Sequence, residues 1–282
     1  MTTPYQQQAA PLGGYTSPIP VRRAHLGDAL ASEWTKIRSV RSTLWTLGVM
    51  IVLILGVGVL AALIVAAQPD PVMSESVNSD SVLSLGFFGV MLGSIPVITL
   101  GVLTLTSEYG TGMIRTTLTA CPSRVRVLAA KSIVFFLLVF VITTASTAVA
   151  SVAQITILDT RTPDVGEWLR ATAGVGVYMA LLGLLSLAVG GLIRHSAGAI
   201  TVMVGVLLLP VVLSIFMYTR ALSGVREALL YYSIPSQLMV FYDIGSGLAT
   251  AGPNGWDPLW IMLGLAAVAM VGAFFVLDKG DV

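Results

Sequence analysis

Residues 44–67 read LWTLGVMIVLILGVGVLAALIVAA, a stretch without a single Asp, Glu, Lys or Arg. A helix needs about 20 mostly apolar residues to cross the hydrocarbon core of a bilayer, and this stretch is long enough. Further charge-free runs of similar length follow it at 82–106, 132–158, 171–193, 197–219 and 258–277. The pattern predicts an all-α membrane protein with six transmembrane helices in a domain covering residues 44–282.

The composition agrees with a lipid environment. Of the 282 residues, 56% are hydrophobic and only 10% are charged, whereas soluble domains carry about 25% charged residues. Backbone groups in lipid must form hydrogen bonds within their own segment, so helices are expected for these runs. The runs lack the alternation of apolar and polar residues that barrel strands show.

Basic residues are distributed unevenly among the segments between the runs. Eleven of the 15 Lys and Arg residues precede residue 44, lie in the 107–131 segment, or occur as Arg194 and Lys279. The positive-inside rule places such segments in the cytoplasm. We therefore expect a multi-pass membrane protein with both termini and residues 107–131 on the cytoplasmic side.

Two different segments precede the first run. Residues 1–24 are rich in Gln, Pro, Gly and Thr and are predicted to be a disordered cytoplasmic tail. Residues 25–43 place Leu30, Trp34 and Ile37 near one helical face, which predicts an amphipathic helix lying at the membrane surface. The alternative is an ordinary basic segment that only sets the topology.

Several features inside and between the later runs allow two interpretations. Pro96 with Gly89 and Gly93, and likewise Pro210, can serve as hinges or simply allow close helix packing. The segment 220–257 is apolar and rich in aromatic residues. It predicts one or two short re-entrant helices in the outer leaflet, or an amphipathic helix lying on the surface.

The sequence lacks the residues that several kinds of chemistry require. None of the six runs contains Asp, Glu, His, Lys or Arg, which disfavours a proton-driven antiporter. A P-loop needs glycines before a Lys-Ser or Lys-Thr pair, and none of Lys36, Lys131 and Lys279 has them. Cys121 is the single cysteine, and neither H-E-x-x-H nor G-x-S-x-G occurs. We expect no catalytic residue, no metal site and no cofactor in this chain.

Residues 107–131, SEYGTGMIRTTLTACPSRVRVLAAK, form a polar and basic segment between the second and third runs. Gly110 and Gly112 allow the chain to turn, and residues 113–118 predict a short helix that Pro122 ends. A short helix held between two spans can transmit a displacement to both of them. The alternative is a connecting loop whose charges only set the topology.

Two stretches, ASEWTKIRSVRSTLWTL at 31–47 and SEYGTGMIRTTLTACPSRVRVLAAKSIV at 107–134, resemble permease subunits of ABC-2 type transporters, especially the actinobacterial ones. The resemblance covers the whole chain in order. It implies that residues 25–43 are an elbow helix, with Leu30, Trp34 and Ile37 on its apolar face. It also implies a coupling helix between the second and third spans, and re-entrant external helices between the fifth and sixth.

The same resemblance implies a function. Two permease subunits, either identical or sister chains, would form the translocation pathway of an exporter. Two separate ATP-binding subunits would bind ATP and Mg and dock on the coupling helix, and no nucleic acid would take part. The residues implied for contact or for positioning the loop are Glu108, Gly110, Gly112, Met113, Arg115, Thr116 and Arg124.

The absence of charge in the spans suits an apolar or amphiphilic cargo such as a drug, a lipid or a lipopeptide. Two other functions share the predicted architecture. One is a non-transporting membrane scaffold, sensor or immunity protein. The other is a secondary transporter that works without an ATPase, although it would need ion-coupling groups in the spans. An ATPase gene next to this gene would favour the permease.

Overall fold

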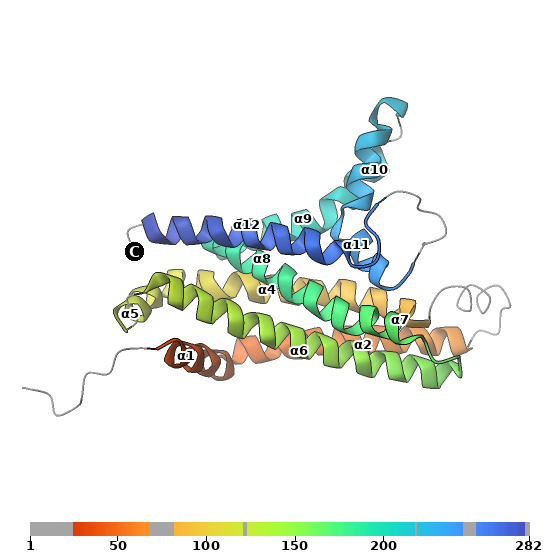
Figure 1. Cartoon of the computed structure of the whole chain (residues 1–282), viewed down its shortest axis with the longest axis horizontal. Helices are drawn as coiled ribbons and strands as arrows, with labels where there is room; N and C mark the ends of the chain where they lie inside the picture. The colour runs from red at the N-terminus through yellow and green to blue at the C-terminus, as the bar shows by residue number, and fades with distance from the viewer. Residues whose placement is uncertain (1–24, 68–81, 121–122, 218, 245–251, 280–282) are drawn as a thin grey trace, which may run out of the picture.

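The computed structural model of the chain describes residues 25–67, 82–120, 123–217, 219–244 and 252–279. These residues form helices and contain no strand (Figure 1). Six helical segments are long and apolar enough to cross a membrane, which agrees with the predicted all-α fold with six candidate spans. The predicted tail at 1–24 and the predicted helix stop at Pro122 lie outside the described residues.

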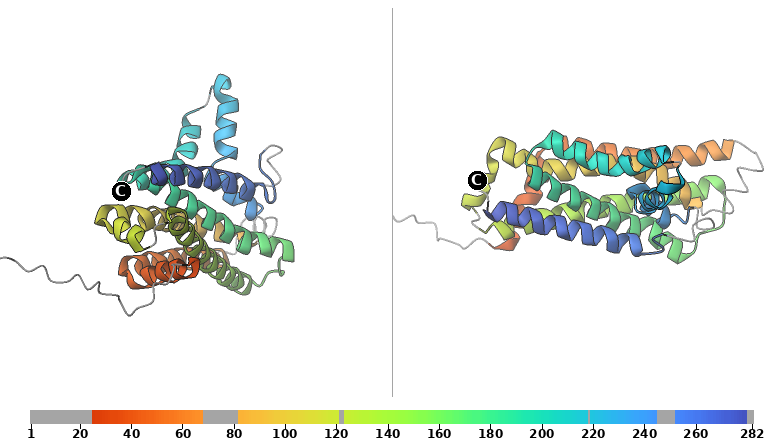
Figure 2. Two further views of the ribbon diagram at one scale, coloured as in Figure 1. Left: turned by 60° about the vertical axis from the view of Figure 1, so that its left-hand side comes forward. Right: turned by 90° about the horizontal axis from the view of Figure 1, so that it is seen from above.

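The six candidate spans form a bundle, with shorter helices at its two ends (Figures 1 and 2). The spans are α2 (Arg41–Ala67), η1 with α4 (Val82–Gly86 and Phe87–Thr111), α6 (Arg124–Leu158), α7 to α8 (Val165–Leu169, the π-helix η2 at Arg170–Gly174, and Val175–Ile193), α9 (Ser196–Phe216) and α12 (Asp257–Lys279). The shorter elements are α1 (Leu26–Ser39), α5 (Met113–Ala120), η3 (Arg220–Leu222), α10 (Ser223–Tyr231) and α11 (Ile234–Phe241).

The helices α4 and α8 form the centre of the bundle. Their most apolar windows are 61% and 67% buried, against 17–33% for the other four spans. Glycines let the central helices approach their neighbours closely. A Cβ on Gly101 of α4 would lie 2.5 Å from the carbonyl oxygen of Gly183 on α8, and one on Gly89 would lie 2.7 Å from that of Ile54 on α2. Packing therefore explains these glycines without a hinge.

The span helices extend beyond the charge-free runs, and for α4 and α6 this affects the candidate site. α6 begins at Arg124, where the Ser123 hydroxyl accepts a hydrogen bond from the Arg126 amide, and it therefore includes Lys131. α4 continues through Glu108 to Thr111. The charge-free runs underestimate the lengths of α4 and α6, because a helix ends where its backbone is capped and not where the first charge occurs. As a result, Glu108 and Lys131 lie within continuous span helices.

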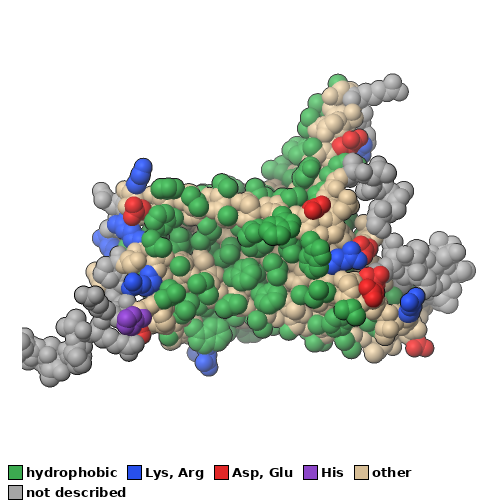
Figure 3. All heavy atoms as spheres, in the orientation of Figure 1, with side chains coloured by type: hydrophobic (Ala, Val, Ile, Leu, Met, Phe, Trp, Pro, Cys, Tyr) green, Lys and Arg blue, Asp and Glu red, His purple; other side chains and the backbone are tan. Residues whose placement is uncertain are grey.

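The two ends of the bundle differ. α1, α5 and the last turn of α12 lie at one end, while α7, α11 and the start of α12 lie at the other (Figure 1). α10 projects sideways from this second end and packs on α9. On the face in Figure 3, a broad apolar band separates charged side chains that gather mainly toward the two ends. This pattern is what a membrane-spanning bundle requires.

Candidate functional site: a buried ion cluster beneath a short exposed helix

Gly112 produces the turn that directs α5 away from α4. Its φ is +71°, in the left-handed region, and its amide donates a 3.3 Å hydrogen bond to the carbonyl of Tyr109. A residue with a Cβ is strained in this conformation, whereas glycine adopts it readily. The new helix starts at the next residue, Met113, so the turn takes a single residue.

The α5 helix has an inward side and an outward side. Ile114 is buried against the bundle, and Thr117 and Leu118 are half-buried. Met113, Arg115 and Thr116 are exposed. Met113 is 44% exposed and faces outward in part. The outward side of α5 is therefore available to another molecule.

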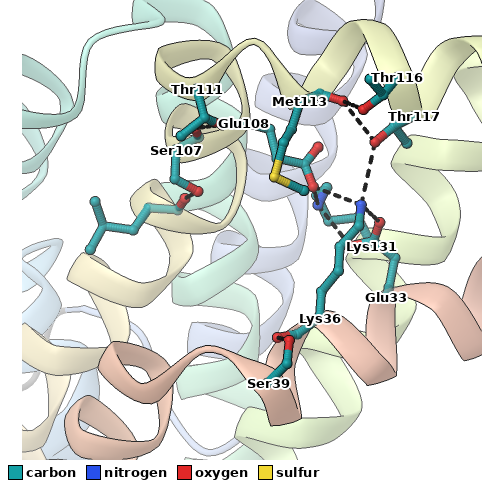
Figure 4. Close-up of polar contacts among 11 residues, drawn as sticks. Glu33, Lys36, Ser39, Ser107, Glu108, Thr111, Met113, Thr116, Thr117 and Lys131 are labelled. Atoms are coloured by element: carbon teal, nitrogen blue, oxygen red, sulfur yellow. Dashed lines mark hydrogen bonds and ion pairs between the residues drawn. The ribbon is translucent and has the colours of Figure 1, made fainter.

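Four charged side chains from three helices meet beneath α5 (Figure 4). The Lys131 ammonium of α6 lies 2.7 Å from Glu33 Oε2 of α1 and 2.9 Å from Glu108 Oε1 of α4. The Lys36 ammonium lies 2.7 Å from Glu33 Oε1 and 2.8 Å from the same oxygen of Glu108. Each lysine thus bridges both carboxylates, and the four residues form what we call the ion cluster.

The ion cluster is shielded from water. Lys131, Glu33 and Glu108 are 2%, 4% and 5% exposed, and the Lys36 side chain is 27% exposed. Removing a charge from water is costly, and only close pairing offsets that cost. Two carboxylates and two ammonium groups balance the net charge. The cluster therefore links α1, α4 and α6, and its charges are fully paired only when all three helices are packed together.

The pKa of Lys36 reflects its position in the ion cluster. Burial by itself would lower the pKa, because it disfavours the ammonium form. Hydrogen bonds to Glu108 and Glu33, together with their negative charges, outweigh burial and raise the pKa of Lys36 above its ordinary value. The lysine is therefore charged throughout the physiological pH range.

The cluster also connects to α5. Lys36 Nζ lies 3.5 Å from the hydroxyl oxygen of Thr117 on α5, at the long limit for a hydrogen bond. A hollow of about 340 Å³ opens beside the cluster, between α1, α5 and α6. Glu33 and Lys36 line it from α1, and Met113, Thr116 and Thr117 line it from α5. The hollow leaves space for α5 to move relative to α1.

A second contact at the same end involves two arginines and the last turn of α12. Arg124 donates hydrogen bonds to the carbonyls of Leu277 and Asp278, and Arg194 donates one to Val276. The Arg194 guanidinium also lies 5.1 Å from the centre of the Tyr109 ring. Cationic groups at a helix C-terminus satisfy its free carbonyls and complement its dipole. The start of α6 and the α8–α9 turn are thereby anchored to α12.

No family model and no curated protein matches the chain. The candidate site is therefore described from its own geometry. Of the residues selected from the sequence, Glu108, Gly110, Gly112, Met113, Arg115 and Thr116 lie together at the end of α4 and on α5. Arg124 lies apart from them, against α12.

The three residues expected on the apolar face of α1 lie outside the ion cluster. Leu30 and Ile37 are half-buried and Trp34 is 46% exposed, while Glu33 is the one buried residue among those described in α1. α1 therefore turns its charged face toward the protein and leaves much of its apolar stripe exposed. Sequence reasoning missed this cluster, although Glu33 and Lys36 are spaced to share a face and Lys131 lies beside an apolar run.

The site offers an exposed helical surface and a set of buried, paired charges. Within the described ranges, no group of three or more His, Cys, Asp or Glu side chains is arranged to hold a metal ion. The site consists of the exposed helix α5, the turn at Gly112 and the buried ion cluster. Such an arrangement can receive a partner and transmit displacement to α1, α4 and α6.

Proposed function

We propose that this chain is the membrane-spanning permease subunit of an ABC-2 type exporter driven by ATP-binding subunits that are separate chains. The observation that carries the proposal is the connection of the exposed helix α5 to the buried ion cluster. α5 joins α4 through a single glycine, and Thr117 approaches Lys36 of α1. Force applied to α5 would thus reach three helices at once.

In this proposal, the outward side of α5 is the coupling surface. Met113, Arg115 and Thr116 would contact a groove on the ATP-binding subunit, and Gly110 and Gly112 would shape the approach. Glu108 and Arg124 would position the helix, the former through the ion cluster and the latter through α12. ATP and Mg would bind to the partner, since this sequence has no P-loop.

The assembly would contain two permease subunits and two ATP-binding subunits in the plasma membrane. Both permease termini and α5 would lie in the cytoplasm, in agreement with the excess of basic residues in those segments. α1 would act as the elbow helix, and α10 and α11 as re-entrant helices near the outer surface. The cargo would be apolar or amphiphilic, because the charge-free runs that make up most of each span offer no partner for a charged solute.

Co-purification with an ATP-binding protein encoded by a neighbouring gene tests the proposal. The variant Met113→Asp with Arg115→Glu changes two exposed side chains and leaves Gly112 and the ion cluster intact. We expect it to lose the ATP-binding subunit and the export activity. The matched control is Arg161→Glu with Val165→Asp, which makes the same chemical changes on exposed residues at the opposite end of the bundle.

The control should bind the ATP-binding subunit and export as the wild type does. If the α5 variant also binds and exports normally, α5 is not the coupling surface. If the wild-type chain binds no ATP-binding protein, the permease assignment fails, and a scaffold or an ATPase-independent transporter takes its place. Folding of both variants is checked by size-exclusion chromatography in detergent.

A further inference from the structure

A broad apolar groove runs along α8, between α6 and α12. Val177, Leu181 and Leu184 form its floor, and their spacing of four and three residues places them on one face of α8. The groove exists because α6 and α12 each pack along α8 but touch each other in few places. It encloses about 800 Å³ and belongs entirely to candidate membrane spans and the residue before α12.

The walls of the groove exclude most polar ligands. Ser132, on the α6 wall, carries the one hydroxyl group among the lining residues, and it donates a 2.8 Å hydrogen bond to the carbonyl of Leu128. No lining residue is charged, and the indole N–H groups of Trp256 and Trp260 at one end are the remaining donors. A sugar or nucleotide here would leave its polar groups buried without hydrogen-bond partners, which strongly disfavours binding.

The size of the groove favours a lipid chain over a protein helix as its occupant. A stable protein interface buries about 800 Å² on each partner and involves about 20–30 residues a side. Eleven residues line this groove, and its volume lies within the range of about 300–1,000 Å³ of pockets that hold a single small molecule. The groove is therefore suited to one elongated apolar molecule, and too small to support a dimer alone.

Exposed side chains on both walls show how much apolar surface such a molecule would cover. Ile133 and Leu137 of α6 are 41% and 53% exposed, and Leu263 and Trp260 of α12 are 43% and 71% exposed. Tryptophan favours the level of the lipid headgroups, where its ring is in apolar surroundings and its N–H meets water. The Trp256 and Trp260 end of the groove is thus the end at which a headgroup fits.

We infer that the groove between α6, α8 and α12 binds an acyl chain of a bilayer phospholipid, with the headgroup at the tryptophan end. This site is independent of the coupling surface, and it does not require transport or an ATP-binding partner. The bound phospholipid is a structural ligand that fills the space between α6 and α12.

Native mass spectrometry tests the site after reconstitution into vesicles of palmitoyl-oleoyl phosphatidylglycerol and phosphatidylethanolamine and extraction in mild detergent. Leu184→Trp fills the groove from its floor, and Leu137→Trp fills it from an exposed wall position where the fold is not at risk. Each variant should retain one phospholipid fewer than the wild type. The matched control is Val268→Trp on α12, at a position 74% exposed and outside the groove lining.

A phospholipid with a photoreactive acyl chain provides a second readout. It should label the α8 peptide that contains Val177 to Leu184 in the wild type and not in Leu137→Trp. Equal lipid retention in all four proteins would overturn the inference, and so would labelling confined to faces outside the groove. Disulfide formation between two copies of Leu137→Cys would also overturn it, because a second copy would then occupy the groove.

Discussion

Lys131 of α6 donates a 2.7 Å hydrogen bond to Oε2 of Glu33 on α1, although the two residues stand 98 positions apart in the chain. Both are almost completely buried. A helix that only lay on the membrane surface would not need such a contact. The pair, together with Glu108 and Lys36, fixes the orientation of α1 against the bundle and determines which of its faces remains exposed.

Replacing Lys131 should destabilise the protein strongly. In Lys131→Met, the carboxylates of Glu33 and Glu108 stay buried with Lys36 as their shared partner. Breaking a buried pair in this way typically lowers the free energy of unfolding by about 3–5 kcal/mol. Thermal unfolding in detergent, followed by circular dichroism, measures the loss.

The double variant Glu33→Gln with Lys131→Met is the control for that prediction. It removes one charge of each sign, so its loss should be smaller than the sum of the losses of the two single variants. Additive losses would show that the two side chains do not interact, and a wild-type melting temperature for Lys131→Met would mean that the cluster contributes nothing to stability.

The raised pKa of Lys36 predicts how the stability of the protein depends on pH. Because the folded state raises the pKa above its ordinary value of 10.5, the contribution of Lys36 is complete below that pH and is lost as the pH rises through the folded-state pKa. The difference in melting temperature between wild type and Lys36→Met should be constant from about pH 7 to about pH 9. It should shrink above pH 10.5. A difference that already disappears below pH 9, or one that persists unchanged in strong alkali, would contradict the assignment.

The sequence predicted the six spans well because membrane length and the absence of charge act on each run separately. It did not predict the ion cluster, because that depends on how α1, α4 and α6 pack. The amphipathic pattern of residues 25–43 suggested that the apolar stripe determines how the helix lies, and in the protein the buried residue is Glu33. The charge pattern places Lys131 in the polar segment before the third run, since nothing local shows that α6 starts at Arg124.

The two glycines that flank Thr111 should respond oppositely to alanine. Gly112 has a φ of +71°, so Gly112→Ala places a Cβ in the left-handed region and costs about 1–2 kcal/mol. Gly110 is helical with open space around it, and Gly110→Ala should be neutral or stabilise the protein by up to about 1 kcal/mol. Thermal unfolding of both variants checks the contrast. Similar losses in the two would show that the turn does not depend on the left-handed conformation.

Gly101 should be the more sensitive glycine in the centre of the bundle. A Cβ there would lie 2.5 Å from the Gly183 carbonyl oxygen and 2.9 Å from Ser186 Cβ, both on α8. Backbone atoms cannot move aside as a flexible side chain can, so Gly101→Ala must push α4 and α8 apart, at a cost of roughly 1–3 kcal/mol. Gly264→Ala on α12 adds the same methyl group with no atom within 4 Å. It should leave the melting temperature unchanged or slightly raised. Equal behaviour of the two variants would mean that α4 and α8 do not pack as closely as the structure has them, whereas a selective loss in Gly101→Ala is what this close contact predicts.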